Sequence, residues 1–430
     1  MRTWTTLALA MIFGLTVAAT SVARADVFEY VAKPDKAFAW KLNSVKDVPQ
    51  GKVYDLHMVS QVWEGITWEH QIQIYEPKEI KFPDVMGLMI TGGKASPDSI
   101  MLGMMVANMC GFRLAVLYNI PNQPLFNGLG EDALISYTWL KYIETGDENW
   151  PCLFPMVKAS VRAMDVLEKV AAQQWKTKLR GFMVTGASKR GWTTYLTSAV
   201  ENKRVIAMAP MVFDILNMPV QIQHQLDFWG DFSVMIKDYT EKGFMDVMDT
   251  GRAYKLQYIM DPYSYRTRLT MPKLVVLGSN DPYWPTDAVN FYWPGLEQPK
   301  YLLIDPNSAH GLDDKMRVLA TTAAFFRTVA SKKPFPKIKW QWTETPEGAQ
   351  VTVTADPKPV EARIWIARNT IRDFRPVKWE QEPMTADGEK LVGKVAMAEG
   401  QHSAAYGEIV WEIDGQKMYV STTPKILPPK

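Results

Sequence analysis

The sequence predicts an α/β fold, with a mainly parallel sheet covered by helices, followed by a smaller all-β unit. Three observations support this prediction. Short apolar runs alternate with longer helical patterns between residues 85 and 330, which is typical of parallel sheets buried on both faces. A linker rich in proline and lysine follows at residues 332–336. Beyond it, short segments of alternating polarity recur, and this pattern favours antiparallel strands.

The length and composition agree with a globular protein of more than one domain. The chain has 430 residues, which predicts two or three domains at roughly 150 residues each. Its 47% hydrophobic and 22% charged residues exclude disordered, collagen-like and coiled-coil chains. The 48 basic side chains nearly balance the 46 acidic ones, so nucleic acid is not expected as a partner. Two cysteines, Cys110 and Cys152, are too few for a disulfide framework, and whether they pair is left open.

The first 25 residues have the pattern of a secretory signal peptide. Arg2 provides a positive start, residues 7–19 are mainly apolar, and residues 23–25 read Ala-Arg-Ala, the small residues that a signal peptidase recognises. The apolar stretch is shorter than the roughly 20 residues that a membrane span needs. We therefore expect cleavage near Ala25 and a periplasmic or secreted mature chain, with no transmembrane segment.

The elements of the first unit follow from local periodicity. Residues 53–62 and 66–75 flank a turn and predict an antiparallel pair. Six apolar runs then predict the strands of the parallel sheet, at residues 85–91, 113–119, 181–185, 205–213, 273–278 and 301–305. Amphipathic patterns predict covering helices at 155–175 and 312–329. Residues from about 216 to 265 contain no buried-strand run, and we expect this insertion to form a cap over a site.

The segments after the linker predict a β-sandwich of the immunoglobulin-like class. The expected strands lie at residues 338–343, 349–354, 362–366, 391–395, 407–413 and 417–422, with a hairpin turn at Asp414-Gly415. The domain organisation expected is therefore a signal peptide at 1–25, a first domain at 26–333 that contains the cap, and a β-sandwich domain at 337–430.

A candidate nucleophile lies at the end of one expected strand. Residues 186–191 read Gly-Ala-Ser-Lys-Arg-Gly and are followed by a helical pattern. A nucleophilic serine must stand on a tight strand-to-helix turn, which small neighbours allow. Arg190 occupies the position where the usual G-x-S-x-G has its second glycine, and its side chain could crowd the turn. The backbone N–H of Lys189, at the start of the helix, is the first candidate donor to an oxyanion next to Ser188.

Candidate partners for the serine follow two later strands. Asp281 comes after residues 273–278, and His310 comes after residues 301–305. Active sites of parallel sheets lie at the carboxyl ends of the strands, and the order serine, acid, histidine is that of α/β-hydrolases. We therefore predict an α/β-hydrolase fold in which Ser188 is activated by His310 and His310 is oriented by Asp281.

Simpler interpretations exist for both partners. Asp281 precedes a proline and could be a turn residue, and His310 precedes a glycine and could be an ordinary loop residue. Asp214, which follows residues 205–213, is the alternative acid, with Asp305 and Asp287 behind it.

The remaining candidate residues concern the oxyanion and the substrate. The loop after residues 85–91 carries Gly92 and Gly93, and the N–H of Gly93 is the second expected oxyanion donor, although a simple tight turn explains both glycines too. Candidate substrate contacts are Gly92, Asn122, Gln123, Trp192, Trp229 and Trp284. Turn chemistry explains the two amides equally well, and most tryptophans belong to protein cores. No zinc-ligand spacing, C-x-x-C or phosphate-binding glycine loop occurs, so no cofactor or metal is expected.

The sequence resembles the PhoPQ-activated pathogenicity-related protein family, a virulence-associated family of exported α/β-hydrolase-like proteins. The resemblance rests on residues 91–93 (Thr-Gly-Gly), 121–125 (Pro-Asn-Gln-Pro-Leu), 186–192 (Gly-Ala-Ser-Lys-Arg-Gly-Trp), 280–281 (Asn-Asp), on Asp214 and on His310. It implies the fold but no substrate, because the family name records regulation. The serine turn is also similar to that of glucuronoyl esterases, G-C-S-R-x-G, with Lys189 and Gly191 in matching positions and Ala187 in place of cysteine. This similarity implies cleavage of a carbohydrate ester.

The sequence thus predicts an exported serine hydrolase that cleaves an ester or amide through an acyl-enzyme. Its substrate would be a small molecule or a component of the cell envelope, including a carbohydrate ester. The alternative is a catalytically silent binding or signalling protein on the same scaffold, which Arg190 in the serine turn and the appended sandwich favour.

Overall fold

The computed structural model describes residues 26–248 and 250–430. The expected signal peptide, residues 1–25, and its cleavage site lie outside the described residues. Within the described ranges, none of the helices combines the length and the apolar character needed to cross a bilayer.

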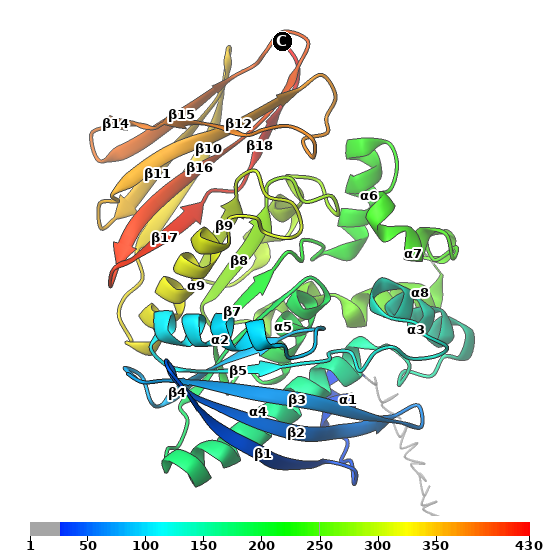
Figure 1. Cartoon of the computed structure of the whole chain (residues 1–430). Coiled ribbons are helices and arrows are strands. Elements are labelled where there is room, and N and C mark those ends of the chain that lie inside the picture. The colour runs from blue at the N-terminus through cyan, green and yellow to red at the C-terminus, as the bar shows by residue number, and fades with distance from the viewer. Residues whose placement is uncertain (1–25, 249) are drawn as a thin grey trace, which may run out of the picture.

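A nine-stranded mixed sheet forms the centre of the first unit (Figure 1), in the order β1-β2-β3-β5-β4-β6-β7-β8-β9. Strands β4 to β9 are parallel, and β1 to β3 form an antiparallel arm that joins the parallel part where β3 pairs with β5. The strands are β1 Ala39–Val48, β2 Gly51–Trp63, β3 Ile66–Pro77, β4 Val85–Ile90, β5 Arg113–Leu117, β6 Gly181–Ala187, β7 Val205–Met211, β8 Lys273–Gly278 and β9 Lys300–Asp305.

The predicted strands of this unit all occur, with ends that shift by a few residues. The turn between β2 and β3 consists of Glu64 and Gly65, whose φ angles of 49° and 74° suit a type I′ hairpin. Strand β1 was not predicted. None of its residues is fully buried, and the apolar alternation of Trp40 and Leu42 does not continue past Leu42, since Ser44 and an exposed Val45 follow.

Helices cover both faces of the sheet. Helices α4 (Leu153–Trp175) and α5 (Lys189–Val200) pack on one face, and α2 (Pro97–Cys110) and α9 (Lys315–Ala330) pack on the other. The expected helices at 155–175 and 312–329 correspond to α4 and α9. Helix α2 begins with a capping box at Ser96 and ends at Gly111, whose left-handed φ of 75° is typical of a glycine that terminates a helix.

The insertion between β7 and β8 is helical and lies over the carboxyl end of the sheet (Figure 1). It contains α6 (Met218–Trp229), α7 (Lys237–Thr240) and α8 (Gly251–Met260), joined by short 3-10 turns. Helix α3 (Glu131–Thr145) packs beside α7 and α8. We refer to residues 216–265 as the cap. The short helix α1 (Val27–Ala32) packs on α4, and the ring of its Phe28 lies 5.4 Å from that of Tyr265 at the end of the cap.

The C-terminal unit consists of two antiparallel sheets, in the orders β10-β11-β15-β14 and β13-β12-β16-β17, with β18 also paired to β16. Apolar side chains of both sheets, such as Val351 and Ile364, belong to one buried cluster. The expected turn at Asp414-Gly415 has φ angles of 49° and 77° and joins β16 to β17. The strands are β10 Lys337–Thr345, β11 Gly348–Asp356, β12 Glu361–Asn369, β13 Glu380–Pro383, β14 Thr385–Asp387, β15 Lys390–Ala396, β16 His402–Ile413, β17 Gln416–Ser421 and β18 Lys425–Leu427.

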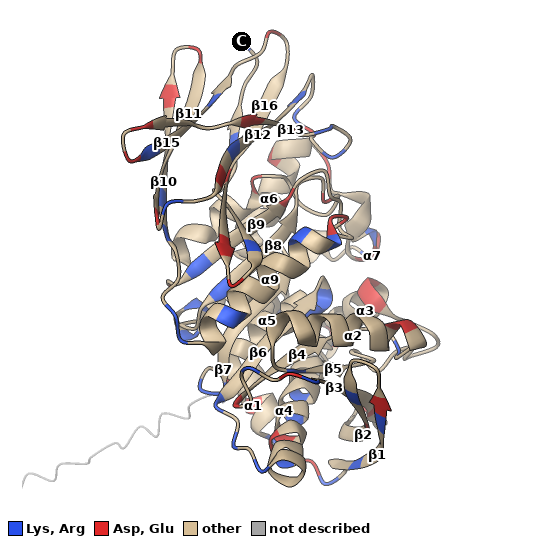
Figure 2. Cartoon of the chain, turned by 60° about the vertical axis from the view of Figure 1, so that its left-hand side comes forward, with Lys and Arg blue, Asp and Glu red and all other residues tan. Residues whose placement is uncertain are grey.

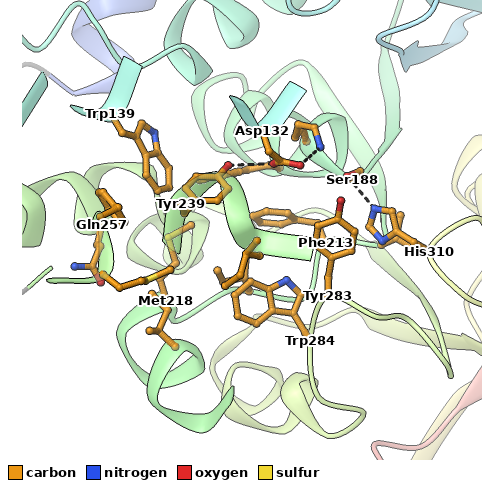
Figure 3. A pocket seen from close by; sticks show the side chains of 18 residues that line it. Asp132, Trp139, Ser188, Phe213, Met218, Tyr239, Gln257, Tyr283, Trp284 and His310 are labelled. Carbon is orange, nitrogen blue, oxygen red and sulfur yellow. Dashed lines mark hydrogen bonds and ion pairs between the residues drawn. The ribbon is translucent and has the colours of Figure 1, made fainter. Parts of the chain in front are cut away.

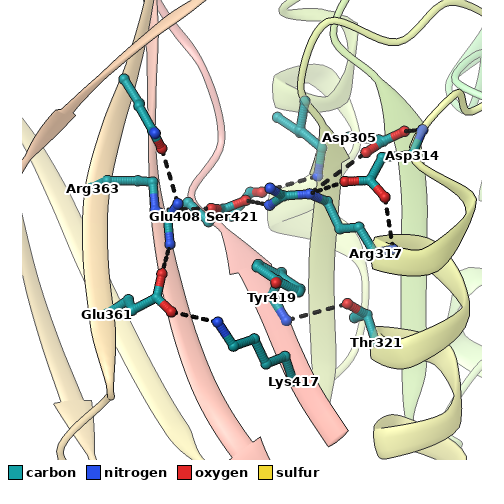
Figure 4. Close-up of polar contacts among 12 residues, drawn as sticks. Asp305, Asp314, Arg317, Thr321, Glu361, Arg363, Glu408, Lys417, Tyr419 and Ser421 are labelled. Atoms are coloured by element: carbon teal, nitrogen blue, oxygen red, sulfur yellow. Dashed lines mark hydrogen bonds and ion pairs between the residues drawn. The ribbon is translucent and has the colours of Figure 1, made fainter.

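A buried ionic cluster joins the two units (Figure 4). Arg317 of α9 contacts Glu408 of β16 at 2.5 Å, and Arg363 of β12 approaches the other oxygen of Glu408 at 3.4 Å. Backbone contacts add to the junction, since the N–H of Ile304 donates to the hydroxyl of Ser421 at 2.9 Å. Elsewhere, acidic and basic residues are interspersed along the elements (Figure 2).

Candidate functional site

Ser188 stands on a strained turn between β6 and α5. Its φ and ψ are 59° and −126°, a conformation that a residue other than glycine adopts only when its surroundings impose it. Two glycines make the turn possible. A Cβ at Gly186 would lie 2.7 Å from the carbonyl oxygen of Arg190, and a Cβ at Gly191 would lie 2.6 Å from that of Met211. The displaced second glycine therefore has a packing role of its own.

Three side chains from separate loops meet in one hydrogen-bonded series. The distance from Ser188 Oγ to His310 Nε2 is 2.9 Å (Figure 3), and the distance from His310 Nδ1 to Asp281 Oδ2 is 2.8 Å. The N–H of Tyr283 donates to the other oxygen of Asp281 at 3.0 Å, which fixes the carboxylate. The ring of Tyr283 also lies over the imidazole, with 4.2 Å between ring centroids.

The alternative acid, Asp214, lies behind this series and contributes no hydrogen bond to His310 among those found in the described residues. One of its carboxylate oxygens is buried and has no hydrogen-bond partner among the described residues. Burial, and less strongly the charges of Asp281 and Asp287, raise the pKa of Asp214 well above its ordinary range. The geometry therefore favours Asp281 as the partner of His310.

The environment of the expected oxyanion donors differs from the prediction in one respect. Lys189 is the first residue of α5, so its backbone N–H has no acceptor within the helix. The N–H of Gly93 instead lies 3.4 Å from the hydroxyl of Thr91, and Gly93 does not line the cavity beside Ser188.

The hydroxyl of Tyr283 points toward Ser188 (Figure 3). Burial raises the pKa of Tyr283 to about 12, and nearby carboxylates such as Asp132 add to this, so the hydroxyl keeps its proton at neutral pH.

A cavity begins at Ser188 and His310 and extends beneath the cap. Its empty space amounts to about 700 Å³, a figure that includes solvent at its open mouth. Most of its wall is apolar and comes from the cap, from α3 and from the segments after β7 and β8. The apolar lining consists of Trp139, Trp192, Val212, Phe213, Ile215, Met218, Ile222, Ile236, Tyr239, Phe244, Met245, Tyr283 and Trp284.

The polar side chains in the wall are engaged by protein partners. Asp132 accepts a hydrogen bond from the hydroxyl of Tyr239 at 3.1 Å and contacts Lys189 Nζ at 2.7 Å. Gln257 donates to the carbonyl oxygen of Met248 at 2.9 Å. Sequence reasoning missed Asp132 and Tyr239, because a single acidic or aromatic residue in a helix carries no local pattern that identifies a cavity wall.

Arg190 does not crowd the serine turn, because its side chain extends away from Ser188. It donates two hydrogen bonds to Glu131, at 2.8 and 2.7 Å, and one to the carbonyl oxygen of Ile120. Burial alone would raise the pKa of Glu131, yet hydrogen bonding and charge from Arg190 lower it to about 2. A Cβ at Gly92 would lie 1.8 Å from the guanidinium of Arg190, so Gly92 accommodates this arginine and does not line the cavity.

Four expected substrate contacts have other partners in the structure. The amide of Asn122 bonds to the backbone of Glu69, and that of Gln123 bonds to Glu131 at 2.6 and 2.8 Å. Trp229 lies under the guanidinium of Arg375 at 4.0 Å. These three residues and Gly92 lie outside the cavity wall, whereas Trp192 and Trp284 line it.

The two cysteines are buried and are not joined. Burial raises the pKa of the Cys110 thiol to about 12 and that of the Cys152 thiol further. Both side chains belong to apolar clusters on opposite faces of the sheet, so they act as small core residues.

Comparisons with known proteins agree with this architecture. The sequence model of the PhoPQ-activated pathogenicity-related protein family matches residues 27–375. The autocrine proliferation repressor protein A of Dictyostelium discoideum is 31% identical over 374 residues, which are 81% of this chain and 75% of that protein. Among solved structures, acetyl xylan esterase 1 from Thermoanaerobacterium sp. JW/SL YS485 has a TM-score of 0.50 and 14% identity, over 71% of this chain and 94% of the esterase. This likeness shows a shared fold, that of α/β-hydrolase esterases.

Proposed function

Because the chain belongs to the PhoPQ-activated pathogenicity-related protein family and has the fold of α/β-hydrolase esterases, we propose that it is a serine hydrolase that cleaves an ester or amide bond. The observation that carries the proposal is the hydrogen-bonded series of Ser188, His310 and Asp281 at the mouth of an apolar cavity. A serine hydroxyl becomes nucleophilic when an oriented imidazole takes its proton.

The proposed reaction proceeds through an acyl-enzyme. Ser188 Oγ attacks the carbonyl carbon while His310 Nε2 takes the serine proton, and Asp281 stabilises the imidazolium. The oxyanion accepts hydrogen bonds from the backbone N–H of Lys189 and the hydroxyl of Tyr283, which replaces Gly93 as the second donor. The alcohol or amine then leaves with the proton from His310. A water molecule repeats the sequence on the acyl-enzyme, which releases the acid and restores Ser188.

A fluorophosphonate probe tests the proposal directly. We expect the probe to label Ser188 in the folded protein and to leave Ser188→Ala unlabelled. The same probe separates the two candidate acids. Asp281→Asn should slow labelling by orders of magnitude, because it favours the wrong histidine tautomer, whereas Asp214→Asn should retain most of the rate. Absence of label in the folded wild-type protein would refute the proposal.

We further propose a carbohydrate ester or another ester of the cell envelope as the substrate. Support comes from the similarity of residues 186–191 to the serine turn of glucuronoyl esterases. By its name, the structurally similar acetyl xylan esterase acts on an ester of this kind. Release of acid from acylated oligosaccharides, measured with wild type and Ser188→Ala, tests this choice.

Export to the periplasm or the medium is also a proposal. It rests on the pattern of the first 25 residues. N-terminal sequencing of the protein expressed from its full coding sequence should yield a chain that begins at Asp26, and an intact Met1 would contradict cleavage.

A second candidate function is a binding or signalling role without turnover. The observation that favours it is the relative of 31% identity, whose name describes repression of proliferation. This candidate predicts a folded protein that hydrolyses no ester. Hydrolysis of a small ester that is abolished in Ser188→Ala would exclude a silent scaffold.

We propose that the two units are domains, at residues 26–333 and 337–430, and that the second is an immunoglobulin-like sandwich. Its strand orders, β10-β11-β15-β14 and β13-β12-β16-β17, follow the ABED and CFG sheets of that class with one strand added beside C. Limited proteolysis should cut first in the linker at 332–336, and initial cleavage within either unit would argue against this boundary.

A further inference from the structure

The cavity wall points to the substrate class of the proposed site. Among the described residues, the wall contains two charged side chains, Asp132 and Lys189, and these pair with each other at 2.7 Å. The hydroxyl of Tyr239 is directed to the same carboxylate. These three polar groups away from the serine are therefore occupied, and a charged or heavily hydroxylated group would lose its hydration here and gain few partners. The remaining wall is aromatic and aliphatic.

The cavity lies where the acyl portion of an ester would be retained. The leaving alcohol takes its proton from His310, whose side chain is 24% exposed at the mouth, so it departs toward solvent. The acyl group stays bound to Ser188 until water attacks, and the space beneath the cap is the apolar volume that adjoins it. We propose that the enzyme prefers esters of apolar acids larger than acetate, of medium-chain aliphatic size. This inference rests on the proposed hydrolase function.

A series of p-nitrophenyl esters tests the preference. We expect kcat/KM to rise at least tenfold from acetate to hexanoate, because each additional methylene is buried in the cavity. Ile222→Trp, which fills the cavity from α6, should lower kcat/KM for octanoate more than for acetate. Val234→Trp, on the exposed outer side of the cap (77% exposed), is the matched control and should follow wild type.

The outcomes separate this inference from the proposed function. Ser188-dependent hydrolysis that is fastest with acetate and declines with chain length would overturn the acyl preference and leave the hydrolase function standing. Failure to hydrolyse any ester, with Ser188 unlabelled by fluorophosphonate, would remove both.

A second inference comes from a different part of the molecule, the segment between β12 and β13, residues 370–379, which we call the clamp segment. It reaches from the C-terminal unit to the loop that carries Asp281. The side-chain amide nitrogen of Asn280 lies 3.0, 3.1 and 2.7 Å from the carbonyl oxygens of Phe374, Arg375 and Val377. Asn280 is the residue next to Asp281, so these contacts hold the acid-bearing loop.

The clamp segment also holds the loop that carries His310. Asn307 donates to the carbonyl oxygen of Trp379 at 3.1 Å and accepts from its N–H at 2.7 Å. The hydroxyl of Ser279 joins the two loops, because it donates to Asn280 at 2.6 Å and accepts from the N–H of Asn307 at 2.8 Å. Both loops are thereby tied to one another and to the same ten-residue segment.

The clamp segment has a third contact, with the end of cap helix α6. Arg372 donates to the carbonyl oxygens of Asp227 and Phe228, and the guanidinium of Arg375 lies over Trp229. Phe374 and Trp379 are each 1% exposed, so apolar burial anchors the segment between the units. Loops at strand ends are otherwise the least stable parts of such a fold, and catalysis tolerates little displacement of its groups.

From these contacts we infer that the C-terminal unit is part of the catalytic scaffold, with Asn280 and Asn307 as positioning residues. Through the clamp segment, the C-terminal unit fixes the distance between Asp281 and His310 and couples that distance to the position of the cap. This inference again rests on the proposed hydrolase function.

The test compares asparagines that cross the same junction. Asn280→Ala and Asn307→Ala in the full chain should each lower kcat for p-nitrophenyl hexanoate by about 10- to 100-fold, with KM changed less than threefold. Rates are expressed per active site titrated with fluorophosphonate, because unfolding lowers the number of sites and not the rate per site. The control is Asn290→Ala, which removes a comparable bond between the units, to the carbonyl oxygen of Pro424 at 2.9 Å, without touching the clamp segment, and it should retain the wild-type kcat.

The result that overturns the inference is a kcat per titrated site in both Asn280→Ala and Asn307→Ala that equals that of Asn290→Ala. A wild-type protein that neither reacts with fluorophosphonate nor hydrolyses esters would instead refute the hydrolase function on which the inference rests.

Discussion

The buried ion pair between Arg317 and Glu408 provides a quantitative test of how the two units are joined. We consider Arg317→Met, which keeps an unbranched apolar side chain but removes the guanidinium and its charge. The Arg317 side chain is 12% exposed, and the carboxyl groups of Glu408 and Asp305 are fully buried. The substitution leaves both carboxyl groups without this cation in a region of low dielectric.

The expected loss of folding free energy depends on the cation that remains beside Glu408. Removing one partner of a buried pair costs about 3–5 kcal/mol, because the other charge stays desolvated. Arg363 still approaches Glu408 at 3.4 Å, so we expect the lower end, about 3 kcal/mol. Lys417→Met is the matched control. It removes an ion pair with Glu361 at 2.6 Å whose side chains are 49% and 38% exposed, and such a pair contributes less than about 1 kcal/mol.

The assay is urea unfolding followed by tryptophan fluorescence, in a double-mutant cycle with Glu408→Gln. The two single substitutions remove the same interaction, so the double variant should lose less stability than their sum, by at least about 1 kcal/mol. Additive losses, or an Arg317→Met protein as stable as Lys417→Met, would refute the reasoning that this pair is desolvated and coupled.

Three further predictions follow from single side chains. Tyr283→Phe should lower kcat for small esters about 100-fold or more by removing an oxyanion donor, and a steady-state kcat within twofold of wild type would contradict that role. Gly92→Ala should lower Tm and activity, because its Cβ would lie 1.8 Å from the guanidinium of Arg190, whereas Gly93→Ala, with only a contact at 3.9 Å, should behave as wild type. Burial lowers the pKa of Lys273 to about 7 from the ordinary 10.5, so the unfolded chain binds a proton that the folded protein lacks between these values. Wild-type stability should therefore rise by about 1.4 kcal/mol per pH unit from pH 7 to 10 relative to Lys273→Met. Free energies of unfolding, measured in urea, that change equally with pH in the two proteins would contradict this prediction.

Local rules explain which parts of the architecture were predictable. Buried parallel strands are short apolar runs, and their carboxyl ends meet at one edge of the sheet. Those rules predicted that Ser188, Asp281 and His310 lie together, and the distances of 2.9 and 2.8 Å agree. Their catalytic roles remain predictions. The expectation that the Arg190 side chain could crowd the serine turn was wrong. This side chain hydrogen-bonds to Glu131 of α3 and therefore extends away from the turn.

The features that escaped prediction depend on partners distant in the sequence. Asn280 and its carbonyl acceptors are separated by 94 to 97 residues. In the sequence alone, an asparagine before an aspartate indicates only a turn. Gln123 has a good local explanation as a substrate contact, yet its bonds go to Glu131. Some polar residues near a site thus contact the ligand, and others position the loops around it. Only their partners in the folded structure distinguish the two kinds.

The cap comes from one uninterrupted stretch of chain between β7 and β8. Seven of the residues that line the cavity belong to it, Met218, Ile222, Ile236, Tyr239, Phe244, Met245 and Gln257, whereas Ser188, Asp281 and His310 lie outside it. The cap therefore supplies part of the cavity wall but none of the three side chains of the proposed catalytic series. Under the proposed function, substitution, insertion or recombination within this single segment would reshape one side of the acyl site while the series stays intact, which would give a lineage with this fold a short path from one ester to another.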